Sequence, residues 1–366
     1  MNEVFKMIYS SGVSFFMESF SALDQYFNIK SSKTYYLLTD ASLYNLAKIF
    51  DELEYPGLHY IDASLKHNGQ KYFFRCVDEI NNFPSFPFTA QNLLYNIKEN
   101  SYLDPYGIYR DLRRETLIES NCVEYRWLKV MAASKLVSRY HYDIDIEQFK
   151  IKSSDEKKEF EPCISDQKEL LVSILTSSNA EKGLELLFSS GFIAEFWPEL
   201  LKMRNIEHSK EYHPEGNVWE HTLEALKYRK DNDLTLSMAL LLHDIGKTIA
   251  TGPKEKPFAE HAELGAKIGY PFLKRLGFSY GFINDVLFLV KYHMLPAALN
   301  NLPVYRMEKA LNHPLFPLLL ELYRADTSAT FRGPEGYYNA CRIYRRYLKN
   351  SGNPYRVVKK SKPVMN

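Results

Sequence analysis

The chain has 366 residues and a formal net charge of +1, with 45% hydrophobic and 25% charged residues. This length is enough for two or three packed units, and the balance of residues is typical of a soluble globular protein. A net charge so close to zero excludes a global attraction to nucleic acid, so any binding of RNA must come from a local basic patch.

The four cysteines lie far apart and form no CxxC pair. Their spacing argues against a disulfide framework or a thiolate zinc site, and it favours a reducing compartment. The apolar residues of the N-terminal segment are interrupted by charged ones, and the apolar run 238–242 is far too short to cross a bilayer. We therefore expect a cytoplasmic protein with no membrane partner.

Strands and turns are predicted mainly in the first hundred residues. Residues 34–39 (TYYLLT) have the pattern of a short buried strand, and Asp40 to Ser42 open a helical pattern, with Asp40 as the expected cap. Strands are also predicted over 58–65 and 71–77, on either side of the turn signal His67-Asn68-Gly69. These elements indicate a small mixed α/β unit.

From Glu119 onward the strand signals nearly vanish. Helical periodicity covers 125–140, 167–176 and 180–189, and it continues through most of the remaining sequence. The polar stretch 150–161 has the composition of an exposed connector. The second part of the chain is therefore expected to be all helical.

The last segment, 339–366, contains eight Lys and Arg residues and no acidic residue. A charge run of this kind is either a solvated face or a tail that contacts RNA phosphates. In the second case Arg342, Arg345 and Arg346 are the candidate contacts. A third interpretation places these three arginines on a final helix packed against the preceding ones.

Residues with metal-ligand side chains begin at His221. Asn217 is a good N-cap for the helix VWEHTLEALKY, with Glu220 three residues later in the position of a capping box. A second helix, predicted over 234–247, is apolar on nearly every face and must be buried, yet His243 and Asp244 lie near its end. A buried imidazole beside a buried carboxylate is costly unless a partner or a cation stabilises both.

Three further residues of this kind follow at the ends of apolar helices: His261, His293 and Asp326. Any one of these histidines alone would more often be a hydrogen-bonded core residue. Together the six predict a site for one or two divalent metal ions. A ligand set of His and Asp accepts manganese, iron, cobalt, nickel or magnesium.

The series H…HD…D resembles the signature of the HD superfamily of metal-dependent phosphohydrolases. The segments HPEGNVWEHTLEAL, LLLHDIGK and HAELGAK are similar to the HD domain of bacterial tRNA nucleotidyltransferases and poly(A) polymerases. The resemblance implies a first metal held by His221, His243, Asp244 and Asp326. It implies a second metal held by His261 and His293 and bridged by Asp244, although those enzymes often have paired histidines where this chain has Tyr292-His293.

The same resemblance implies that Lys247 contacts the substrate phosphate and that Asp244 and Lys247 are the catalytic pair. Arg324 is interpreted either as a second positive charge at the phosphate or as a salt-bridge residue. His213 is expected at the rim of the site and His208 on the surface.

A weaker resemblance to the nucleotidyltransferases extends upstream, through LLTDASLYNLAKIF, FPFTAQNLLYNI and LDPYGIYRDLRRETLI. That family needs a Gly-Gly turn and an Asp-x-Asp pair on a strand to hold two magnesium ions. Here the turn segment keeps only Gly12, and the strand reads Tyr35-Tyr36-Leu37-Leu38. Phe86-Pro87 and Cys122-Val123 replace its Arg-Asp and Glu-Asp motifs. A two-metal polymerase site without its carboxylates cannot bind the ions, so this unit is predicted to be inactive.

These features predict an α+β nucleotidyltransferase-like unit followed by an all-α linker and an all-α HD domain. The expected divisions are 1–118 for the degenerate nucleotidyltransferase-like domain, 119–205 for a helical neck, 206–338 for the HD domain and 339–366 for a basic tail. The expected function is that of an enzyme, a metal-dependent phosphohydrolase acting on a nucleotide, a cyclic phosphate or an RNA 3′ end. The alternatives are a non-catalytic RNA-binding protein and an active tRNA nucleotidyltransferase of the CCA-adding or poly(A) polymerase family.

Overall fold

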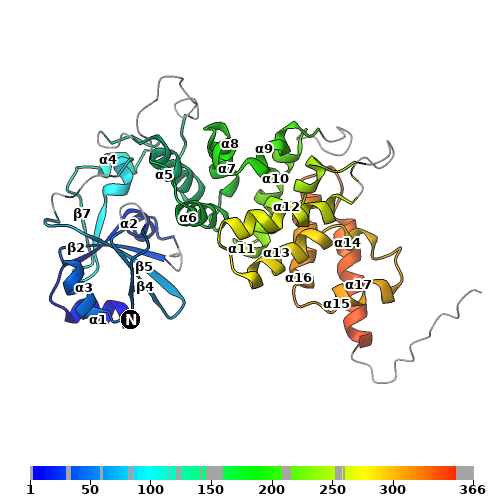
Figure 1. Ribbon diagram of the computed structural model, residues 1–366, viewed down its shortest axis with the longest axis horizontal. Helices are drawn as coiled ribbons and strands as arrows, with labels where there is room; N and C mark the ends of the chain where they lie inside the picture. The colour runs from blue at the N-terminus through cyan, green and yellow to red at the C-terminus, as the bar shows by residue number, and fades with distance from the viewer. Residues whose placement is uncertain are drawn as a thin grey trace, which may run out of the picture. The chain divides into compact units, whose positions relative to one another are not determined.

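The computed structural model describes residues 3–29, 34–57, 61–80, 83, 86–114, 116–120, 125–140, 142–145, 160–207, 216–251, 258 and 260–351. The chain divides into two compact units, Met1–Glu195 and Phe196–Asn366. An α/β sheet unit comes first and an all-helical unit second, as the sequence predicts (Figure 1). Among the described residues no helix is long and apolar enough to cross a membrane.

The first unit is built on one mixed sheet with the strand order β3-β4-β5-β2-β1-β6-β7. Its strands are β1 (Phe15–Glu18), β2 (Thr34–Thr39), β3 (Leu53–Glu54), β4 (Ala63–His67), β5 (Gln70–Cys76), β6 (Leu94–Asn96) and β7 (Ser101–Leu103). Strand β2 pairs with β5 in parallel and with β1 in antiparallel orientation. The predicted strands at 34–39 and 71–77 are confirmed. Only the end of the one predicted over 58–65 is present, because β4 begins at Ala63 and residues 58–60 lie outside the described part.

Short helices and turns complete the α/β region. They are α1 (Glu3–Ser10), α2 (Ser19–Tyr26), α3 (Leu43–Ile49), η1 (Thr89–Asn92) and α4 (Tyr109–Leu112). The predicted capping role of Asp40 is wrong, because the side chain of Ser42 caps α3 by accepting the N–H of Asn45. Asp40 instead accepts the N–H of Ser14 at 3.1 Å, so it ties the start of β1 to the end of β2.

The next helices belong to the same unit as the sheet. They are α5 (Arg126–Arg139), α6 (Ile164–Leu175), α7 (Ala180–Ser189) and α8 (Phe192–Phe196), the last of which spans the division between the units. Arg139 of α5 makes a bidentate ion pair with Asp24 of α2, with both N···O distances at 2.6 Å, and Tyr140 adds a hydrogen bond to the same carboxylate at 2.9 Å. Helices α5 and α7 cross closely because Gly183 has no side chain, and a Cβ there would lie 2.7 Å from the carbonyl oxygen of Ser134.

The second unit is a bundle of helices around α11 (Leu234–Leu242), in which every residue from Leu236 to Leu242 is buried. Helix α11 packs against α10 (Val218–Lys227), α13 (Tyr280–Tyr292) and α16 (Phe316–Ser328). The other elements are α9 (Pro198–Leu201), η3 (Lys202–Asn205), η4 (Ile245–Thr248), α12 (His261–Arg275), α14 (Leu295–Ala298), α15 (Val304–Leu311) and α17 (Glu335–Ser351). A core of this kind needs the all-round apolar pattern that the sequence of α11 has.

Much of the predicted basic tail is a helix that packs on this bundle. Helix α17 begins at Glu335, four residues before the predicted boundary, and the ring of its Tyr344 lies 4.5 Å from that of Phe316. Tyr347 is buried and donates a hydrogen bond to Asn312 at 2.7 Å. The structure therefore favours the interpretation that places Arg342, Arg345 and Arg346 on a final helix. Residues 352–366 lie outside the described part.

Candidate metal centre

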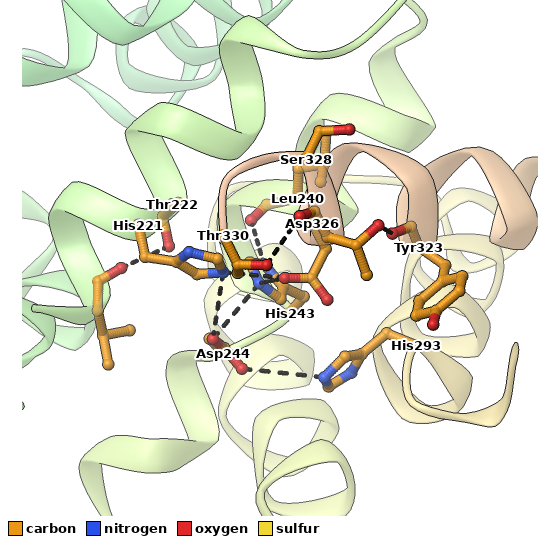
Figure 2. A network of polar contacts seen from close by, with 12 residues as sticks. His221, Thr222, Leu240, His243, Asp244, His293, Tyr323, Asp326, Ser328 and Thr330 are labelled. Carbon is orange, nitrogen blue, oxygen red and sulfur yellow. Dashed lines mark hydrogen bonds and ion pairs between the residues drawn. The ribbon is translucent and has the colours of Figure 1, made fainter. Parts of the chain in front are cut away.

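The six predicted ligands come from separate elements of the second unit and meet at one place. His221 lies in the first turns of α10, which Asn217 caps by accepting the N–H of Glu220 at 3.0 Å. His243 ends α11, His261 starts α12, and His293 ends α13. Asp326 lies in the last turn of α16. Figure 2 shows His221, His243, Asp244, His293 and Asp326 gathered around a common centre.

The predicted continuous helix over 234–247 is wrong in one respect that matters for the site. The α-helix ends at Leu242, and the chain tightens into the 3-10 turn η4 directly after Asp244. Adjacent side chains on an uninterrupted α-helix point about 100° apart. The break at His243 and Asp244 lets both side chains face the same centre.

The first group of ligand atoms lies on one side of Asp244. Its Oδ2 is 3.8 Å from Nε2 of His221 and 3.4 Å from Nε2 of His243. Oδ1 of Asp326 closes this group at 2.9 Å from His221 and 3.6 Å from His243. Two imidazole nitrogens and the Asp244 carboxylate thus lie close enough together to hold one ion, and the Asp326 carboxylate lies beside both imidazoles.

The second group lies on the other oxygen of the same carboxylate. Oδ1 of Asp244 is 3.4 Å from Nε2 of His261 and 3.8 Å from Nε2 of His293. These three residues and the set His221, His243 and Asp244 each have ligand atoms close enough to hold one ion. Asp244 therefore has the position of a bridge between two groups of ligand-type side chains, and His293 belongs to the second group although Tyr292 precedes it.

Backbone carbonyls fix which nitrogen three of the four imidazoles present. Nδ1 of His243 donates to the carbonyl oxygen of Leu240 at 2.7 Å, and Nδ1 of His293 donates to that of Val290 at 2.7 Å. His261 makes the same contact with Phe258 at 2.9 Å. Because a carbonyl only accepts, Nδ1 carries a proton in each of these rings, and Nε2 is the nitrogen that faces the centre. The carbonyl partners were not predicted, since any residue can supply one.

Two features show that the residues fit a cation. Nε2 of His243 is fully buried and has no hydrogen-bond partner among the described residues, which is costly for a polar atom. Nε2 of His261 faces Nε2 of His293 at 3.0 Å, although both rings hold their proton on Nδ1. Two lone pairs at this separation repel each other, and a divalent ion that accepts both removes the repulsion.

The charge state of the centre suits the same role. Burial alone would raise the pKa of Asp244, but Lys247 and the surrounding histidines lower it well below its usual range. Burial likewise opposes ionisation of Asp326, and His221 and His243 lower its pKa well below the usual value. Burial lowers the pKa of His293 to about 4 and also lowers that of His261. At neutral pH these carboxylates are charged, and His261 and His293 are neutral nitrogen donors.

Lys247 reaches into this centre, but Arg324 does not. Nζ of Lys247 is 2.6 Å from Oδ2 of Asp244. Arg324 is paired with Glu321 and donates to the carbonyl oxygen of Tyr228, so its role is that of a salt-bridge residue. His208 and His213 lie outside the described residues.

Gly246 is a further residue on which the geometry depends. A Cβ at this position would lie 1.9 Å from the carbonyl oxygen of His261, so only glycine allows η4 to approach the start of α12. The sequence shows a glycine directly after His243-Asp244-Ile245. It does not show that the backbone of His261 lies against this glycine.

The sheet of the first unit has other side chains where the nucleotidyltransferase family has its metal-binding carboxylates. Strand β2 carries Tyr36, whose hydroxyl donates a hydrogen bond to Glu169 at 2.8 Å. Glu18 of β1 is buried and paired with Arg75 of β5, with N···O distances of 2.5 and 3.0 Å. Glu18, Tyr36 and the Phe86-Pro87 pair line one pocket. Cys122 and Val123 lie outside the described residues.

Comparisons with known proteins agree with this geometry. Residues 210–327 match the family model of the HD domain. The chain is 28% identical over 248 residues to an A-adding tRNA nucleotidyltransferase of Deinococcus radiodurans, a match that covers 63% of this chain and 56% of that protein. It is 32% identical over 188 residues to a CC-adding tRNA nucleotidyltransferase of Thermus thermophilus, covering 48% and 41%. The chain thus spans about half the length of these relatives.

Solved structures extend the likeness over both units. The chain superposes on a Bacillus stearothermophilus CCA-adding enzyme in complex with CTP with a TM-score of 0.58 and 14% identity, covering 95% of this chain and 81% of that one. A tRNA-processing enzyme in its apo form matches with a TM-score of 0.52 and 13% identity, covering 95% and 90%. At such identities the match shows the fold alone. The chain therefore contains an HD domain, joined to a nucleotidyltransferase-like N-terminal unit in the fold of the CCA-adding enzymes.

Proposed function

We propose that this chain is an RNA-processing enzyme of the tRNA nucleotidyltransferase type, and that its HD centre hydrolyses a phosphoester at an RNA end or on a nucleotide. The observation that carries the proposal is Asp244, whose two oxygens each face a separate pair of imidazole nitrogens. The relatives support RNA as the substrate class, because those named above carry tRNA in their names.

Each residue of the centre has a part in this reaction. A divalent ion at such a site lowers the pKa of a water molecule and neutralises phosphoryl oxygens. Asp244 and Asp326 would supply the negative charge that attracts the ions, and the histidines would orient them. Lys247, now on Asp244 at 2.6 Å, would turn to a phosphoryl oxygen when the carboxylate binds an ion instead.

A panel of phosphoesters tests the hydrolytic part. Purified full chain is incubated with a phosphomonoester, an RNA ending in a cyclic phosphate and a simple phosphodiester, each with manganese, nickel, cobalt or magnesium. We expect hydrolysis of at least one substrate that depends on added metal. Absence of hydrolysis in every combination, by protein shown to contain metal, would contradict the proposal.

Nucleotide addition to tRNA is the second candidate, and the comparisons favour it over hydrolysis, because it is the reaction in the names of the relatives. The side chains of the sheet argue against nucleotide addition. Strand β2 holds no carboxylate, and Glu18 is occupied by Arg75. We expect no incorporation of labelled CMP or AMP into tRNA by protein free of host enzyme. Measurable incorporation would make nucleotide transfer the main activity. It would also require catalytic carboxylates elsewhere than on strand β2.

RNA contact by α17 is a third element of the proposal. Arg342, Arg345, Arg346 and Lys349 are exposed along this helix. Affinity for single-stranded RNA falls with salt by a log–log slope of roughly −0.7 for each phosphate contact. Replacing Arg342, Arg345 and Arg346 by glutamine should therefore flatten the slope by about 2. Unchanged slopes would exclude this helix as the RNA contact.

A further inference from the structure

Helix α16 carries a second polar side chain next to the metal centre. Tyr323 precedes Asp326 by three residues, and residues three apart on an α-helix are neighbours on one face. In Figure 2 the ring of Tyr323 extends from α16 on the His293 side of the centre. Neither the binding of metal nor the contact of Lys247 with phosphate requires this tyrosine.

The hydroxyl of Tyr323 lacks the hydrogen-bond partner that buried tyrosines usually have. The residue is 9% exposed, and its hydroxyl makes no hydrogen bond with the described residues. This oxygen is not one of the fully enclosed side-chain atoms, so an incoming group can reach it. A phenylalanine would serve equally well if the ring only filled space. The hydroxyl is therefore available to a molecule that enters the centre.

The first turn of α17 leaves room for this hydroxyl. A Cβ at Gly336 would lie 2.6 Å from the hydroxyl oxygen of Tyr323, but 3.6 Å from Cζ, the ring carbon that bears it. The first distance is a clash, and the second is an ordinary van der Waals contact. Glycine at this position thus accommodates the oxygen and not the ring.

The hydroxyl is a donor at neutral pH. Burial and the carboxylate of Asp326 raise the pKa of Tyr323, and the charge of Arg332 opposes this rise. An ordinary tyrosine already has a pKa of about 10, so this hydroxyl keeps its proton. A hydrogen bond from a hydroxyl to a charged oxygen is about twice as strong as one between neutral groups. An anionic oxygen is therefore the acceptor that suits this position best.

We propose that Tyr323 is a substrate-binding residue of the HD centre, and that its hydroxyl donates a hydrogen bond to a non-bridging oxygen of the phosphoryl group held there. The inference rests on the proposed function for its ligand, a phosphoryl group. It does not require that the group is hydrolysed. Lys247 supplies positive charge to the phosphate, whereas Tyr323 supplies a directed donor that fixes the orientation of the phosphate without adding charge.

Binding of inorganic phosphate to the manganese-loaded full chain tests the proposal without relying on turnover. Titration calorimetry compares the unaltered chain with Tyr323→Phe, which removes only the oxygen. We expect about tenfold weaker binding in the variant, the equivalent of about 1.4 kcal/mol, and an unchanged number of metal ions. Tyr280→Phe, an exposed residue at the start of α13, is the matched control and should leave phosphate binding unchanged.

Three results would overturn the proposal: no phosphate binding by the unaltered chain, equal binding by Tyr323→Phe, or loss of metal from Tyr323→Phe. Failure of the proposed function looks different. Phosphate binding that depends on Tyr323, in a chain that hydrolyses no phosphoester, supports the contact and removes only the hydrolytic activity.

A second variant locates the contact. Gly336→Ala should displace the hydroxyl and weaken phosphate binding by a similar factor. In the Tyr323→Phe background the same change should have no further effect, because Cζ lies 3.6 Å away. Additive losses would show that Gly336→Ala acts through α17, and they would overturn the contact. Circular dichroism establishes that each variant is folded. Should Tyr323→Phe not fold, Gly336→Ala decides alone, and unchanged phosphate binding in it overturns the proposal.

Discussion

The two units bury carboxylates in opposite ways. In the sheet unit, Glu18 and Asp24 are each held by the guanidinium of an arginine, Arg75 and Arg139. In the helical unit, Asp244 and Asp326 are surrounded mainly by imidazole nitrogens, and Lys247 is the cationic side chain bonded to Asp244. An arginine satisfies a carboxylate permanently, because it remains charged in proteins. Imidazole nitrogens leave the negative charge available for a metal ion, so among the described residues the groups of side chains that could hold an ion lie in the helical unit.

The largest effect is expected from removing the bridging carboxylate. Asp244→Ala deletes the group on which both sets of ligands converge, so metal-dependent hydrolysis should fall by at least about a thousandfold, as it does when an essential group is lost. The matched control is Asp285→Ala, an exposed carboxylate on α13. Turnover of the best phosphoester, measured for both variants, checks the expectation. Equal loss in the two variants, or retained activity in Asp244→Ala, would place the reaction elsewhere.

The sheet unit should respond to loss of an arginine in its stability and not in its metal content. Arg75→Met leaves the carboxylate of Glu18 buried without its partner, which costs about 3–5 kcal/mol. The double variant Glu18→Met with Arg75→Met should recover much of this loss. Hydrogen exchange of β1 and β5, with elemental analysis beside it, measures both consequences. A fall in bound metal in the folded variant would show that the sheet also holds an ion.

Acid should weaken the metal-free helical unit. His293 has a pKa of about 4 in the folded protein, below the ordinary value of 6.5, so the unfolded chain binds its proton first as the pH falls. Stability from this group is full above pH 6.5 and is lost as the pH falls toward about 4, by at most about 3 kcal/mol. The lowered pKa values of Asp244 and Asp326 act in the same direction at still lower pH.

Hydrogen exchange of α11 and α13 in chelator-treated protein at pH 7 and pH 5 measures this effect. We expect faster exchange at pH 5, after correction for the intrinsic rate, and a smaller difference in His293→Gln. Protection that is the same at both pH values in the unmodified chain would contradict the charge state assigned to the centre.

A smaller and more selective effect is expected at Gly246. The methyl group of Gly246→Ala would push against the carbonyl oxygen of His261, at a cost of about 1–3 kcal/mol. Because His261 belongs to the second group of ligands, affinity for a second ion should fall more than affinity for the first. Gly281→Ala on α13 is the control, since a Cβ there meets no atom within 4 Å. A metal titration in which Gly246→Ala lowers the affinity for both ions equally would contradict the existence of two separable sites.

The sequence predicts the six ligands because their chemistry is carried by residue type and by position at the ends of apolar helices. It also predicts the loss of the polymerase carboxylates, because the strand that should carry them has no Asp or Glu between Tyr35 and Leu38. It could not predict the partners that depend on the fold, such as the carbonyl oxygen of Leu240 on His243 or Arg75 on Glu18. Nor could the sequence distinguish an extended basic tail from a packed helix, because the same arginines fit both interpretations. The contacts of Tyr344 and Tyr347 with the bundle show that this segment is the helix α17.

Metal stoichiometry of the purified full chain tests the central contrast most directly. Protein loaded with manganese or nickel and freed of excess ion is analysed for metal, together with Asp244→Ala and with the double variant in which Glu18 and Arg75 are methionine. The ligand geometry predicts up to two ions per chain, none in Asp244→Ala and an unchanged number in the double variant. A chain that binds no ion, or one whose metal survives loss of Asp244 and disappears with Glu18, would contradict the account.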